Sequence, residues 1–318
     1  MRVKLKDIDK ELRLSGLLIK VFNFIFFKYV FKIYNIAMKL IKNKLHQDIN
    51  YKEEFIDNPN SDKPLKLCIY SPKNNDKKTG ILWIHGGGFV MGAANNDNYF
   101  IEPFVLEANC TVVSVEYRLS TEAPFPAALD DCATALKWLV ENSESLNIKS
   151  NQIFVGGNSA GGNLCCALSI LSRDKKDVAI AFQMPLYPML DDQMLSESMK
   201  DNNAPLWNEK LNKKAWDLYL KDVSDVSAYA SPSRLKNYHN LPPCFTYIGD
   251  IDPFYNETID YVDNLKKANI NAECLILNGC FHAFEIIKPN SKVAIKSKKM
   301  LLEALKYAQN NYFKEQKQ

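Results

Sequence analysis

Short apolar segments alternate with amphipathic segments along most of this chain, and this alternation restricts the possible folds more than any other feature. Seven of the apolar segments are bounded by Gly, Pro or Asn, and we expect them to be strands: Leu65–Tyr70, Ile81–His85, Thr111–Glu116, Gln152–Gly156, Ile180–Leu186, Cys244–Gly249 and Glu273–Leu277. Several of these segments have no polar alternation, which is typical of strands that are covered on both faces.

Helical spacing marks five further segments: Tyr99–Ala108, Ala127–Glu141, Asn163–Leu171, Glu257–Ala268 and Val293–Tyr312. In Ala127–Glu141, for example, Leu129, Cys132, Leu136 and Leu139 fall on one helical face. Strands that alternate with helices are typical of a mostly parallel sheet with helices on both faces. The sequence therefore predicts an α/β fold.

The polar stretch Asp191–Arg234 interrupts this alternation and has one helix-like patch, near Lys213–Leu220. We interpret it as an insertion over the top of the sheet, where it could form a cap together with the N-terminal helix. The predicted organisation is a single domain over residues 1–318. Its catalytic core would comprise residues 62–190 and 235–315, with a cap segment at residues 1–50 and the cap insertion at residues 191–234.

The region from Leu12 to Ile41 is rich in Leu, Ile and Phe, but it does not read as a membrane span. Its longest uncharged stretch, Val21–Phe27, is far shorter than the roughly 20 residues that a span requires. Five lysines are spaced so that they share one helical face: Lys20, Lys28, Lys32, Lys39 and Lys42. We predict an amphipathic helix packed on the protein itself. A helix lying on a membrane surface and a true span are the alternatives.

Charge balance and the distribution of cysteine and histidine exclude several classes of function. The 40 basic and 37 acidic residues leave a net charge of only +3, and no basic patch with interleaved aromatics stands out, so we expect no nucleic-acid partner. The eight cysteines contain no CxxC pair and the four histidines are dispersed, so we expect no metal site. The cysteines are interpreted as small buried hydrophobes in a reducing compartment, with the cytoplasm as the expected location.

Residues 155–162 read VGGNSAGG, an apolar strand end that runs into Gly157-Asn158-Ser159-Ala160-Gly161. A serine held at the tip of a strand-to-helix turn has a crowded backbone, so neighbours without a Cβ atom are required. Such a turn projects the hydroxyl above the sheet at a helix N-terminus, the geometry called a nucleophile elbow. The same pattern also occurs in ordinary loops, so the rest of the chain must supply partners for Ser159.

The sequence HGGGF at residues 85–89 follows directly after a predicted strand. Consecutive glycines allow main-chain N–H groups to turn outward and to be approached closely by another atom. Donors arranged in this way can stabilise a developing negative oxygen. A tight turn and a phosphate cradle are the alternatives, although a phosphate cradle would favour Lys followed by Ser or Thr where Phe89 and Val90 stand.

Two further candidates follow the last two predicted strands. Asp252 lies at the end of an apolar strand and is followed by the rigid Pro253, and we prefer it to Asp250, which could simply finish the strand. His282 lies in the loop after the final strand. An Asp-Pro turn without chemical function and a packed histidine between two phenylalanines are the alternatives.

The chain order Ser159, Asp252, His282 is the order that α/β-hydrolases use, with each residue placed after a strand at the same edge of the sheet. A serine hydroxyl is a weak nucleophile near neutral pH, so an imidazole must take its proton during attack. A carboxylate on the other ring nitrogen fixes the tautomer and stabilises the positive ring. The sequence therefore predicts a catalytic triad.

These motifs resemble those of the hormone-sensitive-lipase family of α/β-hydrolases, which contains many microbial esterases. The resemblance rests on HGGGF at residues 85–89, GGNSAGG at residues 156–162, the DP pair at residues 252–253 and His282. It extends to YRLSTEAPFPAALDD at residues 117–131 and LYPMLDD at residues 186–192, and so covers roughly residues 65–290.

The resemblance implies that Gly87, Gly88 and Ala160 supply the N–H donors of an oxyanion hole, and that the N-terminus and the later insertion form a cap. It also implies short- to medium-chain acyl esters as substrates and no cofactor. The chain departs from the family at Asn158, where Asp is common, and at Ser120-Thr121, which replaces the usual Ala-Pro. We interpret Tyr117–Pro126 as structural support for the site.

Together these observations predict a serine carboxylesterase that acts on a small acyl ester. A membrane-associated deacetylase or amidase, which would resemble arylacetamide deacetylases, is the first alternative. A non-catalytic binding protein is the second, although His282 is present where a known receptor of this fold lacks its histidine. The pocket beneath the cap is expected to include aromatic residues such as Phe22, Phe24, Phe26 and Trp207. The sequence does not indicate the oligomeric state.

Overall fold

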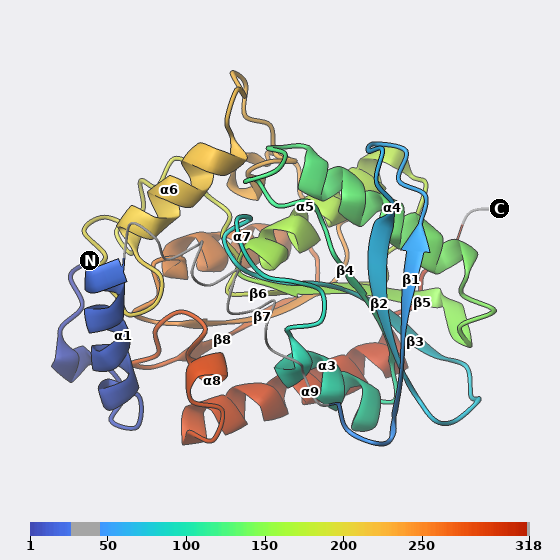
Figure 1. Ribbon diagram of the computed structural model, residues 1–318, viewed down its shortest axis with the longest axis horizontal. Coiled ribbons are helices and arrows are strands. Elements are labelled where there is room, and N and C mark those ends of the chain that lie inside the picture. The colour runs from blue at the N-terminus through green and yellow to red at the C-terminus, as the bar shows by residue number, and fades with distance from the viewer. Residues whose placement is uncertain (27–44, 317–318) are drawn as a thin grey trace.

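A central sheet of eight strands organises the computed structural model, which describes residues 1–26 and 45–316 (Figure 1). The strand order is β1-β2-β4-β3-β5-β6-β7-β8. The strands are β1 (Ile49–Ile56), β2 (Leu65–Pro72), β3 (Lys78–Ile84), β4 (Thr111–Val115), β5 (Ile148–Asn158), β6 (Phe182–Leu186), β7 (Cys244–Gly249) and β8 (Ala272–Leu277). The strand β2 is antiparallel to both of its neighbours, and all other pairs are parallel.

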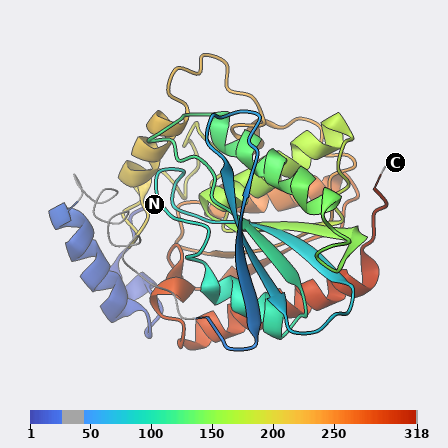
Figure 2. The same ribbon diagram turned by 45° about the vertical axis from the view of Figure 1, so that its right-hand side comes forward.

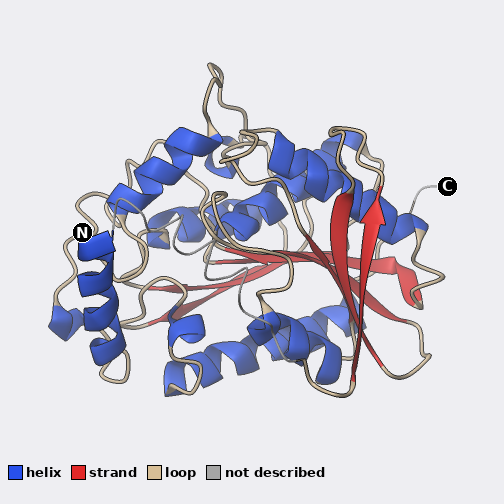
Figure 3. Cartoon of the chain, in the orientation of Figure 1, coloured by secondary structure: helices blue, strands red, loops and turns tan. Residues whose placement is uncertain are grey.

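Helices cover both faces of this sheet (Figure 3). One face carries α4 (Ala127–Glu141), α5 (Ala160–Lys175) and α7 (Tyr255–Lys267), and the opposite face carries α3 (Asn98–Leu106) and α9 (Lys292–Asn311). The turned view in Figure 2 shows that the strands of the sheet fan out with a pronounced twist. The expected α/β class with a mostly parallel sheet is confirmed.

The central strand β3 shows why the sheet needs cover on both sides. All of its seven residues are buried, including Trp83, whose ring contacts Phe100 and Phe104 of α3 at centroid distances of 5.1 and 5.4 Å. On the neighbouring strand, a Cβ atom at Gly156 would lie 2.9 Å from the same ring. The glycine therefore makes room for the largest aromatic side chain of the core.

The seven strands expected from sequence are all present, and the differences have physical causes. The eighth strand, β1, was not predicted, because the charged run Lys52–Glu54 interrupts its apolar residues. It lies at the edge of the sheet, and only one residue of INYKEEFI is buried. Helix α5 begins at Ala160 rather than at Asn163. Gly161 and Gly162 have low helix propensity, which hides the true start from a reading of the sequence.

The N-terminal segment, with its 3₁₀ turn η1 (Leu5–Asp7) and helix α1 (Arg13–Phe26), packs on the rest of the protein. Gly16 lies against Pro205 and Phe281, since a Cβ atom there would be 3.1 and 3.3 Å from their side chains. The amide of Asp9 donates to the carbonyl of Gly279 at 2.9 Å. This half of the predicted amphipathic helix therefore contacts the protein, as expected, whereas Lys28, Lys32, Lys39 and Lys42 lie outside the described residues.

Residues 191–234, where the sequence predicts an insertion, lie between β6 and β7 and contain α6 (Glu209–Tyr219) and the 3₁₀ turn η2 (Pro232–Arg234). The Asn208 side chain caps α6 by accepting from the amides of Lys210 and Leu211. The insertion meets the N-terminal segment directly, because the Val3 amide donates to Asn203 Oδ1 at 2.7 Å. Figure 1 shows α1 and α6 near each other at one end of the sheet. Within the described residues, every helix is too short or too polar to cross a bilayer.

Candidate active site

Ser159 lies at the turn between β5 and α5, in the strained conformation that the sequence predicts. Its φ and ψ angles are 58° and −119°, a region that residues with a side chain rarely adopt. The flanking glycines are required by space. A Cβ atom at Gly161 would collide with the Ile84 carbonyl oxygen, and one at Gly157 would lie 2.5 Å from the Gly161 carbonyl oxygen.

The structure brings Ser159, His282 and Asp252 together in one chain of hydrogen bonds. The Ser159 hydroxyl lies 2.8 Å from His282 Nε2, and His282 Nδ1 lies 2.8 Å from Asp252 Oδ2. All three side chains are buried, with exposed fractions of 6%, 3% and 1%. With the carboxylate accepting from Nδ1, the imidazole carries its proton there and presents an unprotonated Nε2 to the serine.

The two competing aspartates have different roles. The second oxygen of Asp252, Oδ1, accepts from the Phe254 amide at 2.9 Å, which fixes the carboxylate toward His282. Asp250 instead accepts from the Gly279 amide at 2.7 Å, and burial raises the pKa of its carboxyl. The preference for Asp252 agrees with this geometry, and Asp250 braces the loop that leads to His282.

Three main-chain amides near Ser159 have no acceptor in the described part of the chain: those of Gly87, Gly88 and Ala160. Gly87 and Gly88 have φ angles of 120° and 60°, which only glycine adopts without strain. Ala160 is the first residue of α5, so its N–H also lies at the positive end of the helix dipole. Free donors in this position suit an anionic oxygen, as the resemblance implied.

The segment Tyr117–Pro126 supports the glycine loop from behind, in agreement with its interpretation as a structural element. The Tyr117 hydroxyl donates to the His85 carbonyl at 3.0 Å, and its ring stacks on the His85 ring at 4.2 Å. The Ser120 amide donates to the Phe89 carbonyl at 2.7 Å, and the Phe89 ring stacks on Tyr219 of the insertion at 3.8 Å. Ser120, which differs from the residue usual in the family, therefore still makes a main-chain hydrogen bond to the glycine loop.

Trp207 of the insertion lies above the glycine loop. A Cβ atom at Gly88 would collide with its ring, and the ring centroid lies 6.2 Å from that of His282. Its indole N–H donates to Asn212 Oδ1 at 3.1 Å. Trp207 is therefore placed over the reaction centre, as expected. Phe22, Phe24 and Phe26 were expected there as well, but their side chains lie outside the described part of the structure.

Sequence reasoning missed one group beside the triad, the carboxyl of Glu285. It is fully buried, and its Oε1 accepts from the hydroxyls of Tyr187 at 2.5 Å and Tyr247 at 3.1 Å. Burial raises its pKa to about 7, although both hydroxyls act to lower it. The signal that could have found it is a single acidic residue in the apolar run FHAFEII.

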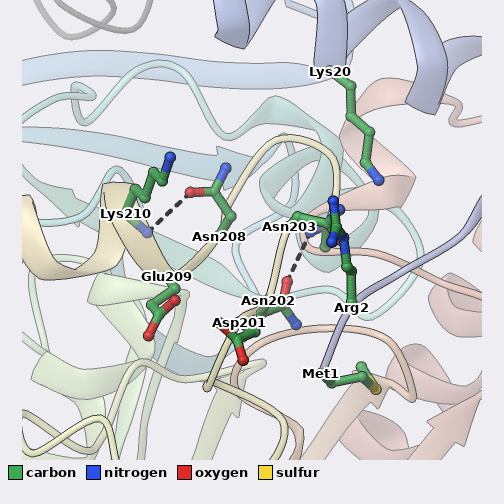
Figure 4. Close-up of a pocket in the computed structure, with 10 residues that line it drawn as sticks. Met1, Arg2, Lys20, Asp201, Asn202, Asn203, Asn208, Glu209 and Lys210 are labelled. Carbon is green, nitrogen blue, oxygen red and sulfur yellow. Dashed lines mark hydrogen bonds between the residues drawn. The ribbon is translucent and has the colours of Figure 1, made fainter.

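A pocket of about 900 Å³ lies where the N-terminal segment meets the insertion. Figure 4 shows Lys20 extending from α1 toward Arg2 and Asn203, with Asn208 and Lys210 on the other side. The rest of its lining consists of Met1, Asp201, Asn202, Ala204 and Glu209. The three triad residues are not part of this lining, so the pocket is separate from the reaction centre.

Comparison with known proteins relates this site to hydrolases. A family model described as the alpha/beta hydrolase fold matches residues 81–286. The chain is 30% identical over 240 residues to esterase LipI of Mycobacterium tuberculosis, and the match covers 74% of each chain. It is also 30% identical over 233 residues to an arylesterase of Saccharolobus solfataricus, and this match covers 70% of this chain and 74% of the relative. A bacterial heroin esterase superposes with a TM-score of 0.87 at 28% identity, covering 96% of this chain and 99% of that one.

The matched region contains all the motifs on which the resemblance rests, from the glycine loop at residues 85–89 to His282. This chain therefore belongs to the α/β-hydrolase fold family, in the hormone-sensitive-lipase group that its motifs resemble.

Proposed function

We propose that this protein is a serine carboxylesterase that hydrolyses short- to medium-chain acyl esters through an acyl-enzyme intermediate. The observation that carries the proposal is the pair of 2.8 Å hydrogen bonds from Ser159 to His282 and from His282 to Asp252, beside amides without acceptors. The relatives described above are named as esterases, which supports an ester as the substrate.

The first step follows from the direction of these hydrogen bonds. As Ser159 Oγ attacks the ester carbonyl carbon, its proton passes to His282 Nε2, and Asp252 stabilises the resulting imidazolium. The carbonyl oxygen becomes an oxyanion and accepts from the amides of Gly87, Gly88 and Ala160. Because these donors are fixed before the reaction begins, each contributes about 10²–10³ in rate in comparable sites.

Collapse of the tetrahedral intermediate completes the cycle. His282 returns its proton to the leaving alcohol, and the acyl group stays on Ser159. A water molecule then gives a proton to His282 and attacks the acyl carbon, which forms a second oxyanion held by the same amides. When this intermediate collapses, the bond from the acyl carbon to Ser159 Oγ breaks, His282 returns the proton to Oγ, and the acid is released. An amide would pass through the same intermediate, so the deacetylase or amidase remains the alternative function.

A series of p-nitrophenyl esters from acetate to palmitate tests this proposal on purified protein. We expect kcat/KM to be highest between acetate and octanoate and to fall steeply for longer chains. The physical reason is that Trp207, held by Asn212, occupies space over Gly88 where a long acyl chain would lie. Equal rates for all chain lengths would contradict the proposed substrate class. Matched p-nitroanilide substrates would reveal an amidase.

We also propose that residues 1–26 and 191–234, which pack against each other, act as the cap of this site. We further propose that helix α1 binds the protein to anionic lipid surfaces. Four apolar side chains lie along one exposed face of α1, with exposed fractions of 70% for Leu14, 47% for Leu17, 62% for Leu18 and 51% for Val21. Arg2, Lys4, Lys6 and Lys10 are exposed in the preceding turn region. An apolar stripe next to basic side chains suits the surface of an anionic bilayer.

Vesicle flotation checks this contact. We expect the protein to float with vesicles of phosphatidylcholine and phosphatidylglycerol, and the double variant Leu14→Ser, Leu18→Ser to lose most of this binding. The matched control is Leu195→Ser, which removes an equally exposed leucine (61%) from the insertion and should bind as wild type does. Both variants should hydrolyse p-nitrophenyl acetate normally. Binding that does not depend on Leu14 and Leu18 would contradict this part of the proposal.

A further inference from the structure

Glu285 lies three residues after His282, in a part of the fold that forces the two together. The main chain at Ala283 has a φ of 51°, so the chain turns sharply after His282 into the short helix α8 (Phe284–Ile287). After this turn the Glu285 side chain is fully buried in the core, with an exposed fraction of 0%.

Tyr187 connects this carboxyl to the histidine. Its ring meets the His282 ring edge-to-face at 4.9 Å, and its hydroxyl donates to Glu285 Oε1 at 2.5 Å. The Tyr247 hydroxyl donates to the same oxygen at 3.1 Å. The other oxygen, Oε2, is buried and accepts from no other side chain of the described residues. Two neutral donors therefore hold this carboxyl, and no Lys or Arg of the described residues is paired with it.

The titratable groups that face Glu285 in the described structure come from α3, from the strand ends and from the catalytic loop: Tyr99, Tyr187, Tyr247, Cys280 and His282. Only His282 among them can become positively charged, and it does so in the proposed reaction when it takes the serine proton.

We propose that Glu285 is a second carboxylate for His282, a positioning residue that stabilises the imidazolium formed during turnover in addition to Asp252. This inference rests on the proposed function.

A structural role alone would not favour an ionisable group at this place. Burial raises the pKa of Glu285 from 4.5 to about 7. Because the folded protein keeps the proton to higher pH than the unfolded chain, the contribution of this group to stability falls as pH rises from about 4.5 through 7. Above that pH the charged carboxylate destabilises the fold. A glutamine would accept the same two hydroxyls without this cost, so the choice of an ionisable group here points to the reaction.

The test compares kcat and KM of wild type and Glu285→Gln for p-nitrophenyl acetate between about pH 5.5 and 9, bracketing the pKa range of the buried carboxyl. At low pH Glu285 is protonated, so the two proteins should have similar kcat/KM. As pH rises through about 7, the ratio of wild type to variant should increase to about tenfold, almost entirely in kcat. The melting temperature of the variant at pH 8 should equal or exceed that of wild type.

Two further variants make the result specific. Asp97→Asn changes another buried carboxyl with a pKa raised by burial, but one that accepts from Trp83 Nε1 and faces His85 rather than His282. The ratio of kcat/KM of wild type to that of Asp97→Asn should therefore not change with pH. Tyr247→Phe removes one donor to Glu285, so the rise of its kcat with pH should have its midpoint at higher pH than in wild type, a comparison that needs only these two proteins. This second readout holds even if Glu285→Gln folds poorly.

The inference is wrong if the ratio for Glu285→Gln stays constant across this pH range, or if only KM changes. It is also wrong if the variant is less stable at pH 8 while its pH profile is that of wild type, because that result describes a packing role. Failure of the proposed function would look different. In that case Ser159→Ala would hydrolyse p-nitrophenyl acetate as fast as wild type does.

Discussion

Replacing Ser159 by alanine is expected to lower kcat/KM for p-nitrophenyl butyrate by a factor of about 10⁴ or more. The serine hydroxyl is the only group in the chain of hydrogen bonds that can form the acyl-enzyme, and alanine removes it without disturbing the amides of Gly87, Gly88 and Ala160. Residual hydrolysis should come from those donors acting on bound substrate with water as the nucleophile. Initial rates on purified protein, with the variant expressed and purified in parallel, give the measurement.

The same experiment has a matched control within α5. Ser169 is also a buried serine, and its hydroxyl donates to the Cys165 carbonyl at 2.8 Å within the helix. Ser169→Ala should therefore keep nearly full activity. Both variants should fold, since the Ser159 hydroxyl contacts only His282 among the described groups. Activity of Ser159→Ala within tenfold of wild type would refute the proposed nucleophile.

Asp252→Asn is expected to have the next largest effect, a loss of about 10⁴ in kcat. The geometry gives the reason. The Phe254 amide would bind the new side-chain carbonyl oxygen where it now binds Oδ1, so the NH₂ group would face His282 Nδ1. The ring would then have to carry its proton on Nε2, where it could no longer accept the proton of Ser159.

Asp250→Asn is the matched control for this change. It alters an aspartate two residues earlier, whose Oδ1 binds the Gly279 amide, and an asparagine can still accept that hydrogen bond. We expect activity within tenfold of wild type and at most a small decrease in melting temperature. Equal losses in the two variants would mean that the loop, and not the orientation of His282, depends on these carboxyls.

The parts of the site that could be predicted from sequence are those with a local physical requirement. Ser159 is recognisable because Gly157 and Gly161 must lack a Cβ atom, which the contacts with main-chain oxygens now explain. Asp252 and His282 lie directly after apolar strands, so parallel pairing places them at one edge of the sheet. Three residues far apart in the chain could be joined because each is tied to a strand end.

Other features depend on contacts between distant segments that have no pattern of their own. Strand β1 pairs with β2 through main-chain hydrogen bonds, and the sequence of its mostly exposed side chains does not indicate this pairing. Glu285 becomes notable only because Tyr187 and Tyr247, from two other strand ends, meet it in the core. The direction of α1 is set by the fit of Gly16 against Pro205 and Phe281, which its amphipathic pattern could not indicate.

The hydrogen bond from Asp9 to Gly279 ties the N-terminal segment to the loop that carries His282, because Gly279 precedes His282 by only three residues. Glu11 adds a second tether by accepting from the Lys292 amide just beyond that loop. Shortening or fusing the protein at this end would thus loosen the geometry of proton transfer without touching any reacting group. An affinity tag for enzymology is better attached at the opposite terminus.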